Sequence, residues 1–429
     1  MTRISPDAFG PVFISYRQSD GTDITAELAW LLRAAGIPVW RDKDDLPPGD
    51  TTERLEQAIG EGLAGAVLVI TPEIEKSTVV KKTEAPLLVR LHAEHPEFAL
   101  GIANAVEREP GKIDYGAPDR LLNHADPTLA SVDQHPTTRA GILVLVQKLL
   151  AHRIAQTRAS IASEGGTFNL NIQTRNTPQV YDRTGSHLDV RIRPSTHERL
   201  PSVDGLRDLA DTIRYLPDSV TRSGANRVRI TGGAHLSVAF AIGASLPSSR
   251  IGHMDVIDQR GETWASDGEA RMPERPLLAV TSQGTNATVQ SSGRPSVAVY
   301  LDLLPQRSDA AFERYLDECR PDIAAWQHLT YAVQELLDPA TAGEVAAEAA
   351  HRIRSLANDH RNAEVHLLLR CPYPITLLVA RLTNTLRIVP YEWDDSDPAP
   401  GDDDYRARYV PTVRVRTSAV DGVIQQVTL

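Results

Sequence analysis

Apolar and polar positions alternate in blocks through the first third of the chain. Short apolar runs predict buried strands at residues 12–16, 37–40, 66–71 and 98–103. Apolar positions three and four residues apart predict helices at residues 24–35, 51–59 and 142–154. Strands that alternate with helices favour a parallel sheet with right-handed crossovers. The pattern therefore predicts an α/β domain at the start of the chain.

A second pattern occurs twice in the remainder of the chain. Its first copy predicts a strand at residues 227–231, a Gly-Gly-Ala-His turn, a helix at 236–246 and a strand at 254–258. Its second copy predicts a strand at 365–369, a turn at 370–374, a helix at 375–382 and a strand at 386–390. Two such units indicate a duplicated domain with pseudo-twofold symmetry. Two unrelated strand–helix–strand units are the alternative.

Composition changes near residue 150, which separates the two patterns. Every lysine lies at or before Lys148, and a small, Gly-rich and Ser-rich stretch covers residues 159–167. We therefore expect a first domain at residues 1–157, a linker at 158–169 and a second domain at 170–429. The two halves of the second domain should cover about residues 170–290 and 291–429.

Charge and composition exclude several classes of protein. The chain has 45 basic and 56 acidic residues, a net charge of −11, so it is not expected to bind a DNA or RNA polymer. No apolar run approaches the roughly 18 residues that span a bilayer, so no membrane association is expected. The first residues lack the apolar segment of a secretory signal, and only two cysteines are present, so we expect a cytoplasmic protein. The sequence suggests no metal and no cofactor.

One carboxylate falls on an apolar helical face. Val80, Glu84, Leu88 and Leu91 recur at helical spacing, and Pro86 fits the first turn of a helix. A carboxylate on an inward face needs a partner or a chemical task. The alternatives are a functional Glu84 and a buried ion pair with Arg17 or Arg90.

The first domain resembles a TIR domain, and the residues that carry the resemblance occur in the family's order. They are Val12-Phe13-Ile14-Ser15-Tyr16-Arg17 with Asp20, Val39-Trp40-Arg41-Asp42, Leu46-Pro47-Pro48-Gly49-Asp50, and Val69-Ile70-Thr71-Pro72 with Ser77 and Glu84. The resemblance implies a flavodoxin-like parallel-sheet fold and places Glu84 at the catalytic position of NAD-cleaving members. One departure is Val80, because the family often has tryptophan four residues before the glutamate.

The resemblance also suggests residues around NAD+. Tyr16 and Trp40 are candidates to pack on a ring of the substrate, with a place in the core as the alternative. Arg17 is a candidate for the pyrophosphate, or it forms a structural salt bridge. Tyr115 is a candidate for stacking or a surface residue. Asp45 lies in the BB loop, through which TIR domains contact one another, or it is a solvated loop charge.

The second domain resembles a SAVED domain, a fusion of two CARF-like, Rossmann-like halves that binds cyclic oligonucleotides. Residues 233–246, 365–369, 372–382 and 388–393 carry this resemblance. The two turns and the end of the last strand supply the candidate nucleotide-binding residues, with turn, core and surface roles as alternatives. They are Gly233, His235, Arg370, Tyr373, Arg387 and Trp393.

Together the two resemblances point to the TIR–SAVED effectors of bacterial CBASS antiphage defence. This implies an NAD+ nucleosidase with NAD+ as substrate and a cyclic oligonucleotide, cyclic tri-adenylate first among them, as activator. Ligand-induced, head-to-tail filament assembly would complete composite TIR active sites and supply the wall that Val80 leaves open. One alternative is a non-enzymatic TIR adaptor that recruits another effector. Another is an enzyme whose second half hydrolyses its own ligand.

Overall fold

The computed structural model describes residues 6–41, 60–124, 128–175, 185–268, 271–286, 294–333, 335–395 and 407–429. The predicted helix at residues 51–59 and the candidate Asp45 lie outside the described residues. The chain forms two compact units, and each is described by itself. The first comprises Met1–Asn169, Pro178–Arg191 and Ser219–Gly224, and the second Leu170–Thr177, Ile192–Asp218 and Ala225–Leu429.

The first unit contains a five-stranded sheet in the order β2-β1-β3-β4-β7. All of its neighbouring strands run parallel. The strands are β1 (Val12–Ser15), β2 (Val39–Arg41), β3 (Gly65–Ile70), β4 (Ala99–Asn104) and β7 (Asp133–Pro136). This is the flavodoxin-like strand order, in which the chain changes direction between β1 and β3. The predicted parallel-sheet fold of the first unit is confirmed.

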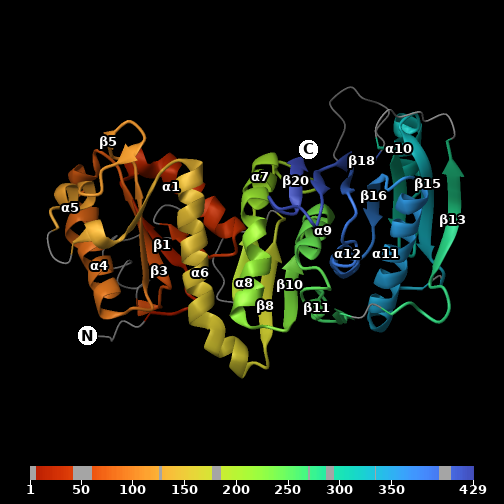
Figure 1. Ribbon diagram of the computed structural model, residues 1–429, viewed down its shortest axis with the longest axis horizontal. Helices are drawn as coiled ribbons and strands as arrows, with labels where there is room; N and C mark the ends of the chain where they lie inside the picture. Colours follow the sequence, from red (N-terminus) through yellow and green to blue (C-terminus); the bar gives the residue numbers. More distant parts are fainter. Residues whose placement is uncertain are drawn as a thin grey trace. The chain divides into compact units, whose positions relative to one another are not determined.

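Helices cover both faces of this sheet. Figure 1 shows α1 and α6 together on one face and α4 on the other. The unit's other elements are α1 (Gln18–Ala34), η1 (Ile74–Lys76), the π-helical turn η2 (Val80–Glu84), α4 (Ala85–Glu94), β5 (Glu107–Glu109), β6 (Lys112–Ile113), α5 (Ala117–Leu122), η3 (Leu129–Ser131), α6 (Arg139–Ser163) and β9 (Leu188–Arg191).

Helix α6 is longer at both ends than its apolar spacing predicts. Thr138 caps its start, because the Thr138 hydroxyl accepts a hydrogen bond from the Gly141 amide. Its end precedes Gly165 and Gly166, which both adopt the positive φ that commonly terminates a helix. The segment 158–169, expected to be a linker, therefore contains the last turns of α6 and the first residues of β8.

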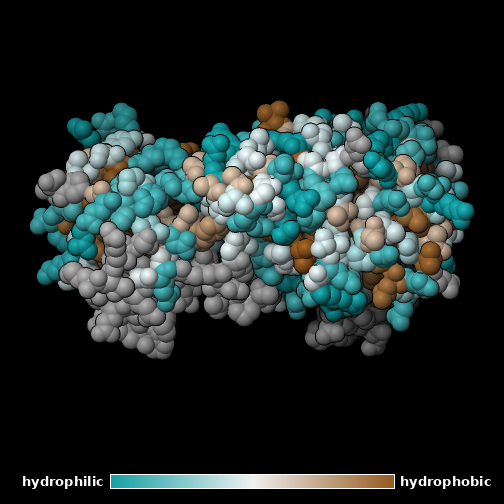
Figure 2. All heavy atoms as spheres, turned by 90° about the horizontal axis from the view of Figure 1, so that it is seen from below, coloured by the Kyte–Doolittle hydropathy of each residue, from teal (hydrophilic) through white to brown (hydrophobic). Residues whose placement is uncertain are grey.

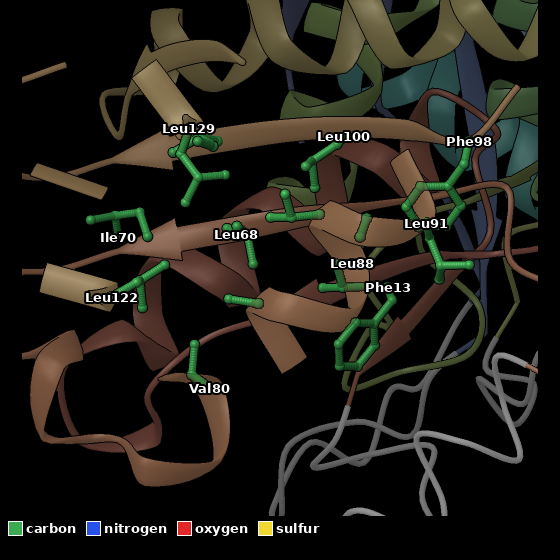
Figure 3. Close-up of a cluster of buried hydrophobic side chains, with 14 of the residues drawn as sticks. Phe13, Leu68, Ile70, Val80, Leu88, Leu91, Phe98, Leu100, Leu122 and Leu129 are labelled. Atoms are coloured by element: carbon green, nitrogen blue, oxygen red, sulfur yellow. The ribbon is translucent and has the colours of Figure 1, made fainter. Parts of the chain in front are cut away.

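The core of the first unit lies between the sheet and α4. Figure 3 shows Phe13 and Leu68 from the sheet close to Leu88 and Leu91 from α4, with Val80 at the edge of the cluster. Val80 and Leu88 are almost fully buried, so the apolar face predicted from their spacing is the face that α4 turns inward.

The second unit contains two sheets. In the first, β12, β11, β10 and β8 are neighbours in that order; the second has the order β13-β15-β14-β16-β17-β19-β20, with β18 beside β17. The strands are β8 (Thr167–Gln173), β10 (Arg227–Gly233), β11 (His253–Ile257), β12 (Thr263–Ser266), β13 (Leu278–Thr285), β14 (Ser296–Asp302), β15 (Ile323–Tyr331), β16 (Glu364–Arg370), β17 (Ile388–Asp394), β18 (Arg408–Pro411), β19 (Val413–Val415) and β20 (Ile424–Val427). The helices that follow α6 are α7 (Val203–Thr212), η4 (Ile213–Tyr215), α8 (Leu216–Ser223), α9 (Leu236–Ser245), α10 (Ala310–Cys319), η5 (Pro339–Thr341), α11 (Ala342–Asp359) and α12 (Tyr373–Ala380).

The repeated pattern corresponds to β10–α9–β11 and β16–α12–β17. In each unit the two strands are adjacent and parallel. The helices α9 and α12 pack against each other between the two sheets (Figure 1). Gly243 makes this close packing possible, because a Cβ atom there would lie 2.5 Å from the Leu377 carbonyl oxygen. The two repeats therefore meet through their helices, as a pseudo-twofold domain requires.

Polar residues predominate on the face of the molecule shown in Figure 2, and apolar residues form small separate patches there. Within the described parts of the chain, no helix combines the length and the apolar character needed to cross a bilayer.

Candidate functional site

Glu84 lies at the carboxyl edge of the first unit's sheet. It is the last residue of the π-helical turn and is only 5% exposed. The Ser15 hydroxyl, at the end of β1, donates a hydrogen bond of 2.5 Å to Glu84 Oε2. Because β1 borders the point where the strand order reverses, the carboxylate is held where flavodoxin-like folds bind their ligands.

Two further polar side chains end strands at this edge. Thr71 directly follows β3, and its buried hydroxyl has no hydrogen-bond partner among the described residues. Asn104 ends β4 and donates to Gln134 Oε1 and to the Asp114 carbonyl oxygen, each at 2.9 Å. A buried hydroxyl without a partner is costly unless a ligand or water satisfies it. The edge therefore carries an ordered polar lining and one open hydrogen-bonding group.

The π-helical turn explains how Glu84 reaches this edge. Pro86 stands near the start of α4, where its missing amide proton is tolerated. The turn Val80–Glu84 precedes it with wider i→i+5 geometry, which is rare and frequent at functional sites. Residues 78 and 79 are already helical, so the π-helical turn joins a short helical start to α4 and lies before the turn that Pro86 occupies.

The arginines proposed as alternative partners of Glu84 lie elsewhere. Arg17 Nη1 pairs with Asp20 at 3.1 Å and with Glu73 at 3.0 Å. Arg90 is exposed on α4. Arg17 thus has the structural salt bridges that were the alternative to pyrophosphate binding.

The other residues predicted to bind NAD+ differ in how deeply their side chains are buried. Tyr16 is buried, and its ring packs against Gly21 in the first turn of α1. Trp40 is half-buried, with its ring centroid 5.2 Å from that of Phe13. Tyr115 is 58% exposed, on the connection between β6 and α5. Tyr16 and Trp40 therefore have mainly packing contacts, whereas the Tyr115 ring is accessible.

In the first half of the second unit, β8 and β10 end side by side, at the kind of edge where open α/β sheets hold ligands in a crevice. Gly232 adopts φ = +95°, and a Cβ atom there would lie 2.2 Å from the Ile172 carbonyl oxygen, so only glycine fits. The nearest atom to a Cβ on Gly233 would be Gln259 Nε2 at 3.5 Å, so the backbone of Gly233 is more accessible.

His235 stabilises this turn from within. It is 2% exposed, and its ring contacts the Thr174 hydroxyl through Nδ1 and the Glu198 carbonyl oxygen through Nε2, at 3.0 and 3.1 Å. A carbonyl oxygen only accepts, so Nε2 carries the proton and Nδ1 accepts from Thr174. Desolvation lowers the pKa of His235 to about 4. The ring is therefore neutral near pH 7, and both of its nitrogens are engaged.

The second half has the corresponding edge where β14 and β16 end. Arg370, the last residue of β16, donates from Nη1 to Asp302 Oδ1 at 2.6 Å. Tyr373 begins α12, and its buried hydroxyl has no partner among the described residues. Burial raises the pKa of this phenol, so it stays protonated as a donor. This edge thus offers a cationic side chain and an unsatisfied hydroxyl.

Trp393 and Arg387 lie at opposite ends of β17. Trp393 is within the strand rather than beyond it, half-buried against an aromatic cluster, and the Arg199 guanidinium lies 6.0 Å from its ring centroid. Arg387 precedes the strand, and its carbonyl oxygen accepts a hydrogen bond from the amide of Val365 near the start of β16. The structure therefore brings Trp393, but not Arg387, to the sheet edge that carries Arg370.

A carboxylate from one half caps a helix of the other. Glu392 is buried in β17, and its Oε1 accepts hydrogen bonds from the amide and hydroxyl of Ser237, at 2.6 and 2.7 Å. Ser237 is in the first turn of α9, where backbone amides attract anions. Desolvation raises the pKa of Glu392, although the bonds from Ser237 oppose the shift. The hydrogen-bond acceptor at this helix start is therefore supplied by the chain itself.

Sequence reasoning found Glu84 and both turns, but it missed Ser15, Thr174, Asp302 and Glu392. For Ser15, a polar residue near the carboxyl end of a predicted parallel strand was the available signal. Thr174 and Asp302 lie at the ends of β8 and β14, which the sequence analysis did not predict, and Glu392 lies within β17.

Comparison with protein families divides the chain in the same order. The TIR domain family matches residues 12–108. The family described as the SMODS-associated and fused to various effectors sensor domain, SAVED, matches residues 209–414. The first match contains Ser15, Thr71 and Glu84, and the second contains both turns.

Individual relatives are distant. The NAD(+) hydrolase PdTIR of Paracoccus denitrificans is 35% identical over 74 residues, which are 17% of this chain and a quarter (25%) of that protein's length. Two structures of the Acinetobacter baumannii Cap4 SAVED/CARF-domain containing receptor, with the cyclic trinucleotides 2'3'3'-cAAA and 3'3'3'-cAAA, are 11% and 12% identical. Their TM-scores are 0.46 and 0.45, and each comparison covers 93% of this chain and 99% of the receptor.

Proposed function

We propose that this chain, a TIR domain followed by a SAVED sensor domain, is an NAD+ glycohydrolase switched on by a cyclic oligonucleotide. The observation that carries the enzymatic part is the buried Glu84 carboxylate beside Ser15 at the reversal point of the parallel sheet. The TIR family match and the relative named as an NAD(+) hydrolase support the choice of NAD+ as substrate.

The chemistry needs few groups. Nicotinamide in NAD+ is already a cationic leaving group, so its bond to ribose breaks without a general acid. The ribose then passes through an oxocarbenium-like transition state, and water adds to its anomeric carbon. A fixed carboxylate in a desolvated site stabilises that positive charge as it develops. Glu84 is the group for this role, and the hydrogen bond from Ser15 fixes its orientation.

The second unit is the sensor in this proposal. Arg370 supplies positive charge for a phosphate, and Tyr373 supplies a protonated hydroxyl at the same sheet edge. Gly233 permits a ligand to approach the backbone at the edge of the other sheet, and Trp393 offers a half-buried ring for base stacking. We propose a cyclic trinucleotide, cyclic tri-adenylate first, as activator. Its binding would drive self-association into a filament and NAD+ depletion in antiphage defence.

A non-enzymatic TIR adaptor is the alternative. An adaptor needs surface contacts, whereas ordering a buried carboxylate costs desolvation energy that only its own hydrogen bonds offset. The burial of Glu84 at the carboxyl edge of the sheet therefore favours the enzyme.

The first prediction concerns Glu84. Glu84→Gln keeps the shape and one acceptor for Ser15 but removes the charge, so NAD+ cleavage should fall roughly 10²–10⁴-fold. Glu94→Gln, at the exposed end of the same helix, is the matched control and should cleave normally. The measurement is nicotinamide release by the full chain with a panel of cyclic di-, tri- and tetranucleotides.

Each outcome of this assay bears on one part of the proposal. Equal turnover by Glu84→Gln and the control would remove Glu84 from catalysis. No nicotinamide release with any cyclic nucleotide that binds the chain in calorimetry would favour the adaptor. Release that is independent of every nucleotide would contradict the gating.

A further inference from the structure

Three side chains that commonly bind metals meet in the second half of the sensor unit. Asp302 ends β14, His328 lies on the neighbouring strand β15, and Asp309 is the residue before α10. One ligand atom from each lies within 4.8 Å of the others. His328 Nε2 is 3.9 Å from Asp302 Oδ2, and His328 Nδ1 is 3.9 Å from Asp309 Oδ1.

The buried atoms of this cluster face one another without hydrogen bonds. Asp302 is 1% exposed and His328 is 3% exposed. Among the described residues, Asp302 Oδ2, Asp309 Oδ1 and His328 Nε2 have no hydrogen-bond partner. A separation of 3.9 Å is too long for a hydrogen bond. One imidazole gives a shared ion a single nitrogen, so only one of these two pairs can belong to the ion directly; taking one ligand atom from each residue, all three atoms lie within 4.8 Å of one another.

The surroundings prepare His328 and Asp302 as ligands. The Tyr300 ring centroid lies 4.6 Å from that of His328 and fixes the plane of the imidazole. Arg370 holds the other oxygen of Asp302, which is the second-shell contact that orients a ligating carboxylate. The charged groups around the cluster are the two carboxylates and the guanidiniums of Arg370 and Arg307.

We propose that Asp302, Asp309 and His328 bind one first-row divalent cation at the carboxyl edge of β14 and β15. A mixed set of two oxygens and one imidazole nitrogen suits Mn²⁺, Co²⁺ or Zn²⁺ better than Ca²⁺ or Mg²⁺, which favour oxygen alone. Three protein ligands leave coordination positions open for water or a phosphate oxygen. The cation would fasten residues 303–308, which connect β14 to α10, against β15.

This proposal differs from the expectation of no metal, which stays a prediction until metal binding is measured. The ligands are distant in sequence and form no recognisable motif, so only the fold brings them together. The assignment is independent of NAD+ cleavage and of the identity of the cyclic nucleotide.

The test is metal binding by the full chain. After treatment with a chelator, the protein is titrated with Mn²⁺, and the loss of the free-ion electron paramagnetic resonance signal gives stoichiometry and affinity. We expect one saturable site. Asp309→Asn should weaken it at least tenfold, whereas Asp317→Asn, an exposed aspartate on α10, should not change it. Asp309 makes no side-chain cap bond, so its replacement should leave the helix intact.

The second variant is His328→Gln, which should lower Mn²⁺ affinity at least tenfold while circular dichroism stays unchanged. If that variant misfolds, the comparison of Asp309→Asn with Asp317→Asn decides alone. Absence of a saturable site in the wild-type chain would overturn the assignment. Equal affinity in Asp309→Asn and Asp317→Asn would overturn it as well.

Discussion

The hydrogen bond from Ser15 to Glu84 joins a strand end to a helical turn that lies 69 residues later in the chain. Ser15→Ala removes this bond and leaves one carboxylate oxygen with fewer donors. A poorly oriented catalytic group typically costs about 10²-fold in rate. We therefore expect the kcat for NAD+ cleavage to fall roughly 10–100-fold with little change in KM. Steady-state nicotinamide release in the presence of the activating nucleotide measures both constants.

Ser131→Ala is the control for this experiment, because Ser131 is an exposed serine of the same unit. It should leave both constants unchanged. If Ser15→Ala raises KM at constant kcat, then Ser15 contacts substrate instead of orienting Glu84.

His235 gives the sensor unit a dependence on pH. Its folded pKa of about 4 lies below the ordinary value of 6.5, so the unfolded chain binds more protons between these values. Stability from this group is complete above about pH 6.5 and is lost as the pH falls towards 4. We expect it to contribute a loss of roughly 2 kcal/mol between about pH 7.5 and pH 5.

Urea unfolding, monitored by hydrogen exchange of the backbone amides of α9, gives the free energy of unfolding at both pH values and hence this loss. Desolvation also lowers the pKa of His328 and His366 in the same unit, so the change of the wild-type free energy of unfolding with pH contains their contributions as well. His235→Gln removes the contribution of His235 alone, so the free energy of unfolding of this variant should change less with pH than that of the wild type. An identical change with pH in wild type and variant would show that His235 does not titrate in this range.

At the scale of single residues, what could be predicted from the sequence depended on how far apart in the chain two contacting residues lie. The burial of Glu84 followed from its spacing with Leu88 and Leu91, because local periodicity reports which face of a helix is buried. Ser15 did not follow, since hydrogen bonds between distant strands and helices leave no local pattern. The same applies to Asp302 and His328, which meet only through the pairing of β14 with β15.

At the scale of elements, the contact of α9 with α12 depends on the absence of a side chain at Gly243. A methyl group there would lie 2.5 Å from the Leu377 carbonyl oxygen and 2.9 Å from Ala380 Cβ. Overpacking of this kind costs about 1–3 kcal/mol, which exceeds the gain of up to about 1 kcal/mol in helix propensity. Gly243→Ala should therefore lower the free energy of unfolding of the second unit, measured by urea denaturation.

Gly233→Ala is a suitable comparison, since its new methyl group would meet Gln259 Nε2 at an ordinary 3.5 Å. It should leave the stability of the ligand-free chain within about 0.5 kcal/mol of wild type. A stability loss of equal size in both variants would show that the α9–α12 contact is not the tight point of the fold.

The repeated strand–helix–strand units were predictable because apolar residues predominate in them, as in β16 and α12. The sheet of the second half was not fully predictable. The apolar residues of β13 end at Val280 and its second half is mostly exposed, and β15 mixes buried and half-buried residues. The Gly-rich stretch after α6 looked like a linker, although its glycines end one helix just before the next strand.

For the whole molecule, the net charge of −11 opposes association of free protomers. A ligand that drives assembly must create a contact strong enough to overcome this repulsion. Heterologous contacts that do not close into a ring produce open filaments. We therefore expect light scattering to grow with added activating nucleotide, and NAD+ cleavage to rise in the same concentration range.

Dilution of the protein is the control, because the rate of assembly-dependent NAD+ cleavage falls more steeply than the protein concentration does. NAD+ consumption without any growth in scattering would contradict the assembly mechanism. The switch would then operate within a single protomer.

The two sheet edges of the sensor unit differ in character, although the strand–helix–strand units beside them repeat. One carries the neutral pair of Thr174 and His235, and the other carries the charged pair of Asp302 and Arg370. Two identical halves would favour a ring that looks the same after half a turn, with an even number of nucleotides. Under the proposed function, unlike halves are free of that constraint, because each half would contact a different nucleotide. A messenger with an odd number of bases would then fit this fold.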